Sequence, residues 1–355
     1  MLARDVRRMV FGRLRGVHKK RLRTISAAVL GFLKVPRLGI AALGRALEGP
    51  ALPRHRIKRV WRLVANPRFD TAVIQEALLR QAAELFRPLV LSLDWVELRD
   101  GCRALVAAVS AGHRRAIPVA WVVVQPRRFR RSQNSVEDAF VERLAAILAG
   151  AGGAPACIVA DRGFRRATFL RLLDGLGLGY VIRVCGHVHV SGRRYTGLLE
   201  ACGLAENAEA DLGRLSYRED GLATTRIVWR WTRAQDEPWL LATNLRKGIK
   251  RLCEIYALRM EEEESFRDLK SHRFGAALRY LKLSGTDRYD RILAIWALGT
   301  WLLHAQGNAA VRANLHHGLS TASNRRRDLS LVTIGRLLIP LPLGSPSTLF
   351  RLLAA

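Results

Sequence analysis

The chain has 355 residues and a formal net charge of +29, from 59 Lys and Arg against 30 Asp and Glu. This excess is far more than solubility requires, so we expect a polyanionic partner, nucleic acid first and an anionic membrane surface second. A hydrophobic content of 49% allows a large core in two or three domains, which argues against a basic structural protein of ribosomes or chromatin.

Residues 1–86 are predicted to form a helical, basic DNA-binding region. Residues 1–60 contain 16 Lys and Arg but only two acidic residues, Asp5 and Glu48. We expect short helices that are interrupted at Pro36, Gly39, Gly44, Gly49–Pro50 and Pro67. An organellar targeting segment has a similar composition, but the basic character continues through RHRIKRVWRL (54–63), beyond the usual length of such a segment. We therefore favour DNA binding.

From residue 87 the pattern becomes that of a mixed α/β domain. Three strands joined by short turns are expected to form an antiparallel meander, at 88–96, 103–110 and 116–125. The elements expected next are a helix over 135–150, a strand over 156–161, a helix over 164–176 and a strand over 180–184. Because the later strands need crossover connections, we expect a mixed sheet with helices on its faces.

After residue 184 we expect a β-rich insertion, one further strand and two helices. Residues 185–237 are polar, with short alternating runs such as TTRIVWRW, and are expected to form a β-rich insertion. An apolar strand over 238–245 and a long helix through 256–270 follow. Another helix is expected at about 288–305, before a basic patch, NRRRDLS (324–330).

Neither a zinc site nor a membrane span is indicated. The five cysteines have no zinc-type spacing, and we expect them to be reduced thiols of a cytosolic protein. No apolar run reaches about 18 residues without a charge, so the apolar stretch 292–303 is expected to be a buried helix.

The stretch YALRMEEEESFRDLK (256–270) is the most informative part of the chain. On one α-helix, four of its residues would lie within about 60° of one another: Tyr256, Arg259, Glu263 and Lys270. The phenol, guanidinium and ammonium groups suit a phosphate, and the carboxylate suits a metal ion. The spacing leaves open a plainer alternative, a solvated face on which Arg259 and Glu263 form an i,i+4 pair.

Two further carboxylates stand at the ends of apolar strands. Asp94 follows LSL and Asp161 follows IVA, and side chains at strand ends emerge at the sheet edge where ligands bind. Asp161 could instead cap the helix that follows it. Together with Glu263, these residues would supply hard oxygen ligands that suit Mg²⁺ or Mn²⁺ better than zinc. Two such ions can support in-line phosphoryl transfer.

Through these residues, the chain resembles the DDE transposases of bacterial insertion sequences, in the family numbered four with its Tyr–Arg–Glu–Lys signature. The resemblance covers nearly the whole chain and is densest from residue 88 to about 275. The signature has two, three and six residues between its members, and the four residues of 256–270 meet it. Other glutamates in the run 261–264 are alternatives for the third carboxylate, but only Glu263 keeps the register. The family's two aspartates match Asp94 and Asp161.

The resemblance implies a ribonuclease-H-like catalytic core with a mixed sheet. The core would comprise residues 87–184 and 238–280, with the β-rich insertion of residues 185–237 between them. The helical region 1–86 would precede the core, and a helical C-terminal region, 281–355, would follow it.

Two finer assignments also come from the resemblance. Trp239 matches a tryptophan that accepts a flipped base near the transposon end, with a core tryptophan as the alternative. Arg183 matches an arginine that contacts DNA. Because Arg183 lies in an apolar strand, its charge needs a partner.

The implied activity is cut-and-paste DNA transposition by metal-dependent phosphoryl transfer. It would generate a 3′-OH at each transposon end, pass through a hairpin intermediate and join the end to target DNA. Asp94, Asp161 and Glu263 would hold two Mg²⁺ or Mn²⁺ ions. The phosphate near the cleaved end would be held by Tyr256, Arg259 and Lys270.

The implied partners are double-stranded DNA, at the transposon ends and the target, and a second copy of the chain in a dimeric synaptic complex. A cytoplasmic, nucleoid-associated location is expected, with no membrane partner. Two alternatives are kept: a ribonuclease-H-fold nuclease without strand transfer, and a non-catalytic DNA-binding derivative of a transposase.

Overall fold

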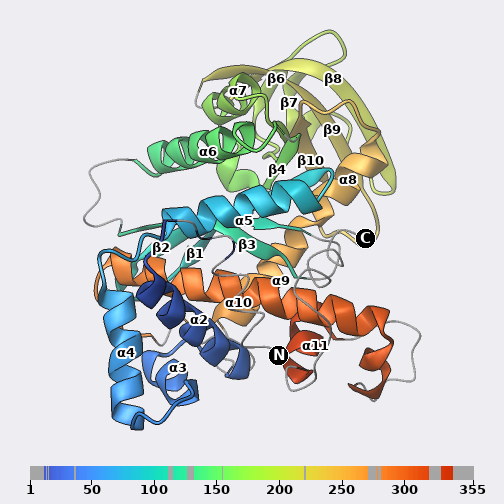
Figure 1. The fold of residues 1–355 in the computed structure, drawn as a ribbon. Coiled ribbons are helices and arrows are strands. Elements are labelled where there is room, and N and C mark those ends of the chain that lie inside the picture. Colours follow the sequence, from blue (N-terminus) through green and yellow to red (C-terminus); the bar gives the residue numbers. More distant parts are fainter. Residues whose placement is uncertain are drawn as a thin grey trace. The chain divides into compact units, whose positions relative to one another are not determined.

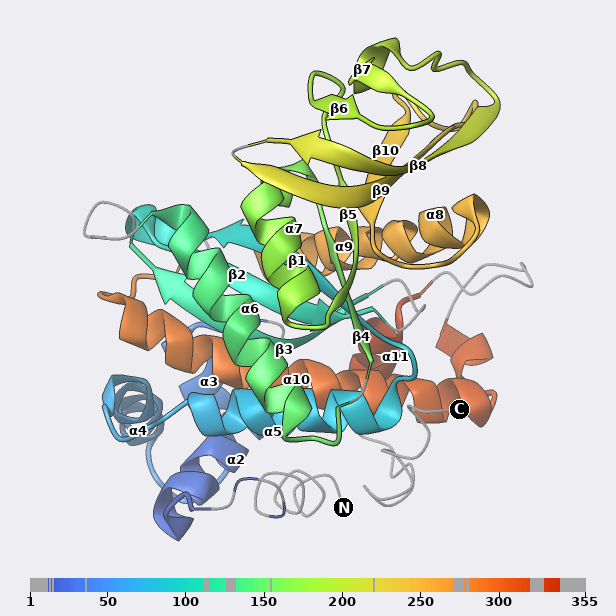
Figure 2. The same ribbon diagram turned by 90° about the horizontal axis from the view of Figure 1, so that it is seen from above.

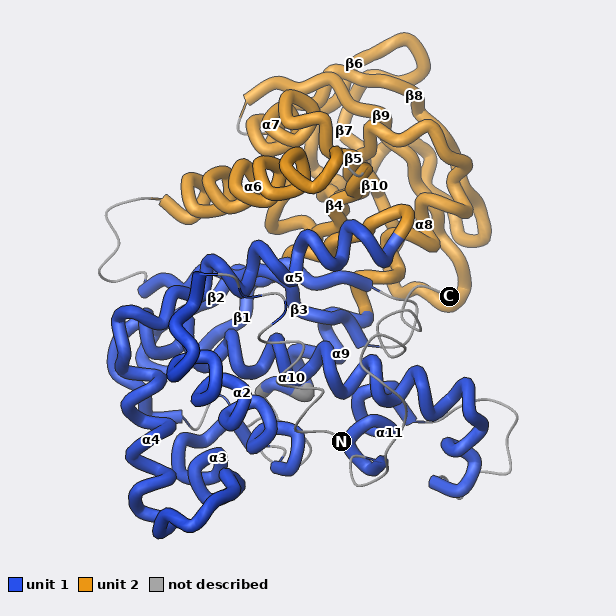
Figure 3. Tube along the Cα trace, in the orientation of Figure 1, with its two compact units in different colours: residues 1–86, 95–130, 261–355 blue, residues 87–94, 131–260 orange. Residues whose placement is uncertain are grey.

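The computed structural model describes residues 12, 14, 16–35, 37–110, 115–125, 132–153, 155–219, 221–270, 278, 281–319 and 329–338. The chain divides into two compact units (Figure 3). Unit 1 comprises residues 1–86, 95–130 and 261–355, and unit 2 comprises residues 87–94 and 131–260.

The strands form one ten-stranded mixed sheet, which confirms the predicted mixed α/β class (Figure 1). Its order is β3-β2-β1-β4-β5-β10-β9-β8-β6-β7. The pairs β1–β4 and β4–β5 are parallel, while β2–β3 and the pairs from β5–β10 to β6–β7 are antiparallel. The strands are β1 (Leu89–Glu97), β2 (Arg103–Val109), β3 (Ile117–Val124), β4 (Ala156–Ala160), β5 (Gly179–Arg183), β6 (His189–Ser191), β7 (Thr196–Leu198), β8 (Ala208–Arg218), β9 (Leu222–Trp231) and β10 (Trp239–Thr243).

The five strands expected before residue 185 are confirmed within a residue or two at each end. The β-rich character of residues 185–237 is confirmed as well, and its strands β6 to β9 are hydrogen-bonded into the same sheet through β10. All five residues of β4 are buried, as expected for a central parallel strand covered on both faces. In β9, residues 222–227 alternate between exposed and more buried positions.

In unit 2, helices lie on both faces of the sheet (Figure 2): α6 (Gln133–Ala149) and α7 (Ala167–Gly175) on one face, α8 (Ile249–Ala257) on the other. Ser132 caps α6, its side chain accepting a hydrogen bond from the amide of Ser135. The helix expected over 164–176 begins later, at Ala167. Residues 162–164 form a 3-10 turn, and the turn closes on the carbonyl of Asp161.

A hydrophobic cluster fills the space between α8 and the sheet. Its members include Val90 on β1, Val159 on β4, Val181 on β5 and Leu241 on β10, packed with Tyr256 and other residues of α8. Because side chains alternate between the two faces of a strand, these positions identify which face α8 covers.

Unit 1 is mainly helical. Its helices are α2 (Lys19–Lys34), α3 (Ile40–Ala46), α4 (Pro53–Ala65), α5 (Ala72–Leu85), α9 (Arg259–Lys270), which starts two residues before the unit, α10 (Thr286–Arg312) and α11 (Leu331–Leu337). Helix α10 extends beyond the predicted 288–305 and is buried along most of its length, packing against β3, α2 and α11.

Gly44 does not interrupt a helix as predicted, because it lies inside α3. A Cβ atom at this position would be 2.5 Å from the Cα atom of Ile57 on α4. The glycine therefore permits the close approach of α3 and α4. A similar contact joins α10 to α11, where a Cβ on Gly307 would be 1.9 Å from the carbonyl oxygen of Leu331.

The single helix predicted over 256–270 is wrong, since a turn at Leu258 separates α8 from α9. The amide of Leu258 donates to the carbonyl of Ile255, so the last turn of α8 tightens to a three-residue hydrogen bond. Tyr256 therefore lies on α8, and Arg259 begins α9.

All five cysteines are free, as expected, and burial raises the pKa of Cys157 to about 12. Most of the basic patch at 324–330 lies outside the described residues. Among the residues that are described, no helix combines the length and apolarity needed to cross a bilayer.

Candidate active site

Three of the predicted site residues form a row across adjacent parallel strands of unit 2. Leu93 on β1 pairs with Ala160 on β4, and Ala160 pairs with Ile182 on β5. The next residues along these strands are Asp94, Asp161 and Arg183. Because neighbouring strands lie about 4.8 Å apart, this register brings the two aspartates side by side, with the arginine next to Asp161.

The row continues the sheet face that α8 covers. Asp94 follows Val90 by four residues, and Asp161 follows Val159 by two, so both aspartates belong to the face of the hydrophobic cluster. The site therefore lies where an apolar sheet face ends, with polar side chains replacing the valines.

Arg259 connects α9 to this row. Its guanidinium lies 3.6 Å from the carboxylate of Asp94, and its side chain is only 10% exposed. The guanidinium carbon also lies 5.9 Å from the ring centre of Tyr256. The structure thus brings the carboxylate of Asp94 next to a guanidinium and a phenol that lie more than 160 residues later in the sequence.

Asp161 caps the 3-10 turn that follows it, whereas the helix for which the sequence left this role open, α7, has Arg166 at its N-cap. The Oδ1 atom of Asp161 accepts a hydrogen bond of 2.8 Å from the amide of Gly163, which starts the 3-10 turn. This bond holds the carboxylate in one orientation next to Asp94. Capping and ligand binding are compatible, because the bond uses one of the two oxygens.

Tyr256 and Trp239 form the apolar wall of the site. Their rings meet edge to face with centres 4.9 Å apart. Tyr256 is almost fully buried, whereas Trp239 is partly exposed and also packs on the hydrophobic cluster. Trp239 therefore combines core packing with an accessible surface.

The phenol of Tyr256 is a buried donor. Burial raises its pKa, Arg259 and Arg183 offset part of the shift, and Asp161 adds to it. The group is therefore protonated at neutral pH. Within the described residues its buried hydroxyl has no well-formed hydrogen bond, and Arg259 is the polar group that acts on it.

Arg183 has the partner that its apolar strand requires, and that partner is Glu237. The guanidinium lies 2.8 Å from one carboxylate oxygen of Glu237 and also donates to the carbonyl of Pro238 at 3.3 Å. The other oxygen of Glu237 is 3.8 Å from Arg162. Glu237 was not singled out from the sequence, since an acidic residue in a polar loop before β10 carries no periodic signal.

Glu263 and Lys270 belong to unit 1, on α9. Glu263 is exposed and lies one helical turn after Arg259. The side chain of Lys270 lies outside the described residues.

The donor chemistry of the two aspartates fits Mg²⁺ or Mn²⁺, which prefer carboxylate oxygens. A cation between them would compete with Arg259 for Asp94. In the part of the chain that is described, no three His, Cys, Asp or Glu side chains lie close enough together to hold a metal ion. The structure thus supplies two candidate ligands in one place.

No protein-family model matches this sequence, and no curated protein matches it either.

Proposed function

We propose that this protein is a transposase that cuts and joins DNA by metal-dependent phosphoryl transfer. It would generate a 3′-OH at an insertion-sequence end, pass through a hairpin and transfer the strand to target DNA. The core would be ribonuclease-H-like and formed by residues 87–184 and 238–280. The observation that carries the proposal is the strand register that sets Asp94 beside Asp161, with Arg183, Tyr256 and Arg259 around them.

The carboxylates of Asp94, Asp161 and Glu263 would hold two Mg²⁺ or Mn²⁺ ions, which activate the attacking oxygen and stabilise the leaving oxygen when bound. Glu263 is assigned from its place in the Tyr–Arg–Glu–Lys signature. Such a site needs no proton-transfer residue with a shifted pKa, because most of the catalysis comes from positioning and charge.

The other side chains would orient the phosphate. Arg259 can exchange its weak contact with Asp94 for a phosphate oxygen, and Tyr256 can donate its buried hydroxyl to the same group. Arg183 and Lys270 add positive charge on the DNA side. The exposed part of Trp239 could stack on a base displaced from the helix.

Cleavage of a defined substrate tests the proposal. The substrate is a plasmid that carries both DNA flanks of the coding sequence, incubated with purified protein and Mg²⁺. We expect cutting at the flanks, and we expect Asp94→Asn and Glu263→Gln to abolish it while DNA binding remains. Glu264→Gln is the matched control, because it changes the adjacent glutamate of the same helix. Wild-type cutting by Glu263→Gln would refute the assignment.

The same system separates the alternatives. A flank that is already cut and ends in a 3′-OH should be joined to target DNA by a transposase. A ribonuclease-H-fold nuclease would cut the plasmid but leave this end unjoined. A non-catalytic derivative would bind both substrates and change neither.

A further inference from the structure

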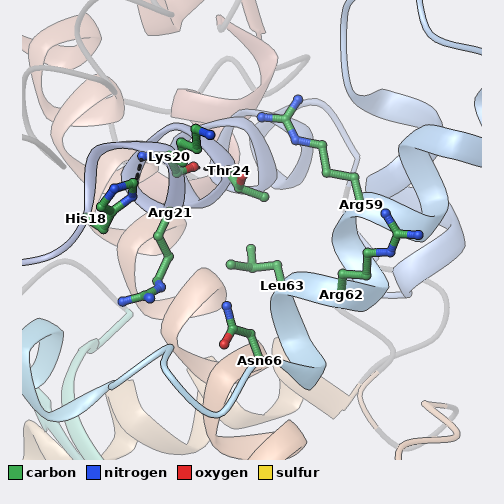
Figure 4. Close-up of a pocket in the computed structure, with 8 residues that line it drawn as sticks. All are labelled: His18, Lys20, Arg21, Thr24, Arg59, Arg62, Leu63 and Asn66. Carbon is green, nitrogen blue, oxygen red and sulfur yellow. Dashed lines mark hydrogen bonds between the residues drawn. The ribbon is translucent and has the colours of Figure 1, made fainter.

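A basic pocket lies in unit 1 between α2 and α4, with a volume of about 450 Å³ (Figure 4). Four cationic side chains line it, Lys20 and Arg21 from α2 and Arg59 and Arg62 from α4. Among the described residues that line the pocket, none carries a carboxylate. The pocket therefore gathers positive charge from two helices that are separate in the sequence.

No acidic side chain in the described part of the chain neutralises this charge. Within the described residues, the four cations make no ion pair, and the buried Nε atom of Arg21 has no hydrogen-bond acceptor. Between residues 6 and 69 the only acid is Glu48, and it pairs with Lys34 instead. A buried donor and uncompensated charges both favour an external acceptor.

The helices themselves make the arrangement unfavourable without an anion. Lys20 and Arg21 stand in the first turn of α2, where the positive end of the helix dipole repels cations. Arg59 and Arg62 are three residues apart on α4, so their like charges are neighbours. A bound anion would relieve both repulsions at once.

The lining also has the polar groups that an oxyanion needs. Guanidinium groups bind phosphate through two parallel hydrogen bonds, and this pocket holds three of them. Thr24 and Asn66 add uncharged polar groups to the lining. A site lined by three guanidinium groups suits a phosphate better than an uncharged small molecule.

We propose that this pocket binds a backbone phosphate of duplex DNA. The inference rests on the proposed function, to which it adds a defined contact formed by other residues than those assigned to the cleaved phosphate. Phosphate contacts of this kind set the register of a protein on DNA without reading its sequence. The pocket would therefore position the DNA and take no part in the chemistry proposed for Asp94, Asp161 and Glu263.

Two matched double variants test the site. Lys20→Ala/Arg62→Ala removes one exposed cation of the pocket from each helix. Arg23→Ala/Lys58→Ala removes one exposed cation from each of the same helices outside the pocket. Binding of a fluorescently labelled duplex is measured by anisotropy over a range of salt concentrations, with EDTA present so that no cleavage occurs. Thermal unfolding checks that both variants are folded.

We expect the pocket variant to lower the steepness of the salt dependence by about one and to weaken binding about fivefold at about 0.15 M salt, because the contact to one phosphate is lost. The control variant should change both quantities much less. Equal losses in the two variants, or no loss in the pocket variant, would overturn the proposal. Loss of binding to phosphatidylserine vesicles without loss of DNA binding would assign the pocket to lipid and overturn it too.

The outcome for the pocket is separable from that for catalysis. If the wild type shows the expected binding pattern but never cuts the flanking DNA, the pocket stands and the proposed activity fails. If the wild type cuts and both variants bind equally well, the activity stands and the pocket assignment fails.

Discussion

The ion pair between Glu237 and Arg183 predicts that a loop carboxylate competes with DNA. Glu237 contacts Arg183 at 2.8 Å and Arg162 at 3.8 Å, so it holds two guanidinium groups that a phosphate could use. DNA that binds Arg183 must first displace Glu237. Glu237→Gln removes the negative charge and keeps the size of the side chain, and should therefore strengthen DNA binding.

The expected gain in DNA affinity follows from the exposure of the Glu237 side chain. The Glu237 side chain is 52% exposed, and ion pairs at such positions contribute about 0.2–1 kcal/mol. The gain in affinity should therefore reach at most about fivefold, since 1.4 kcal/mol corresponds to a factor of ten. The free energy of unfolding should fall by less than about 1 kcal/mol for the same reason.

The assay is anisotropy of a labelled duplex at physiological salt with EDTA present. Asp236→Asn is the matched control, because it removes the same charge one residue away and Asp236 makes no ion pair within the described residues. Arg183→Ala should weaken binding. If Glu237→Gln also weakens binding, Glu237 orients Arg183 for DNA and does not compete. An equal gain in DNA affinity in Asp236→Asn would show that the loss of one negative charge, and not the loss of the ion pair with Arg183, strengthens binding.

Two further predictions concern stability. In urea unfolding, Gly307→Ala should lower the free energy of unfolding by about 1–3 kcal/mol, because the new methyl group meets the backbone of Leu331. The control is Gly175→Ala in α7. Its methyl group meets nothing within 4 Å, so the free energy of unfolding should hardly change. Burial raises the pKa of Tyr180 from 10.0 to about 12, so its contribution to stability is complete below pH 10 and is lost between pH 10 and 12. Urea unfolding across that range should show a decline of about 1.4 kcal/mol per pH unit from this group, which is absent in Tyr180→Phe.

Local patterns predicted most elements of the chain. The apolar runs of β1 and β4 and the helical apolar spacing of α6 are signals carried by neighbouring residues, and these elements were predicted within a few residues. Local reasoning failed where packing decided the outcome. Gly44 remains helical because α4 passes too close for a side chain, and the turn at Leu258 divides a stretch whose charges read as one helix.

The sequence by itself determined which residues are candidates for the chemistry: two strand-end aspartates, a row of side chains that suit a phosphate, and a large positive charge. These depend on residue type and spacing alone. Only the tertiary structure decided which of them meet. The register of β1, β4 and β5 aligns Asp94, Asp161 and Arg183, and the loop before β10 gives Arg183 its partner Glu237. It also joins α2 and α4 into a basic pocket. Strand register and helix packing are set by side chains distant in the sequence, so no local pattern records them.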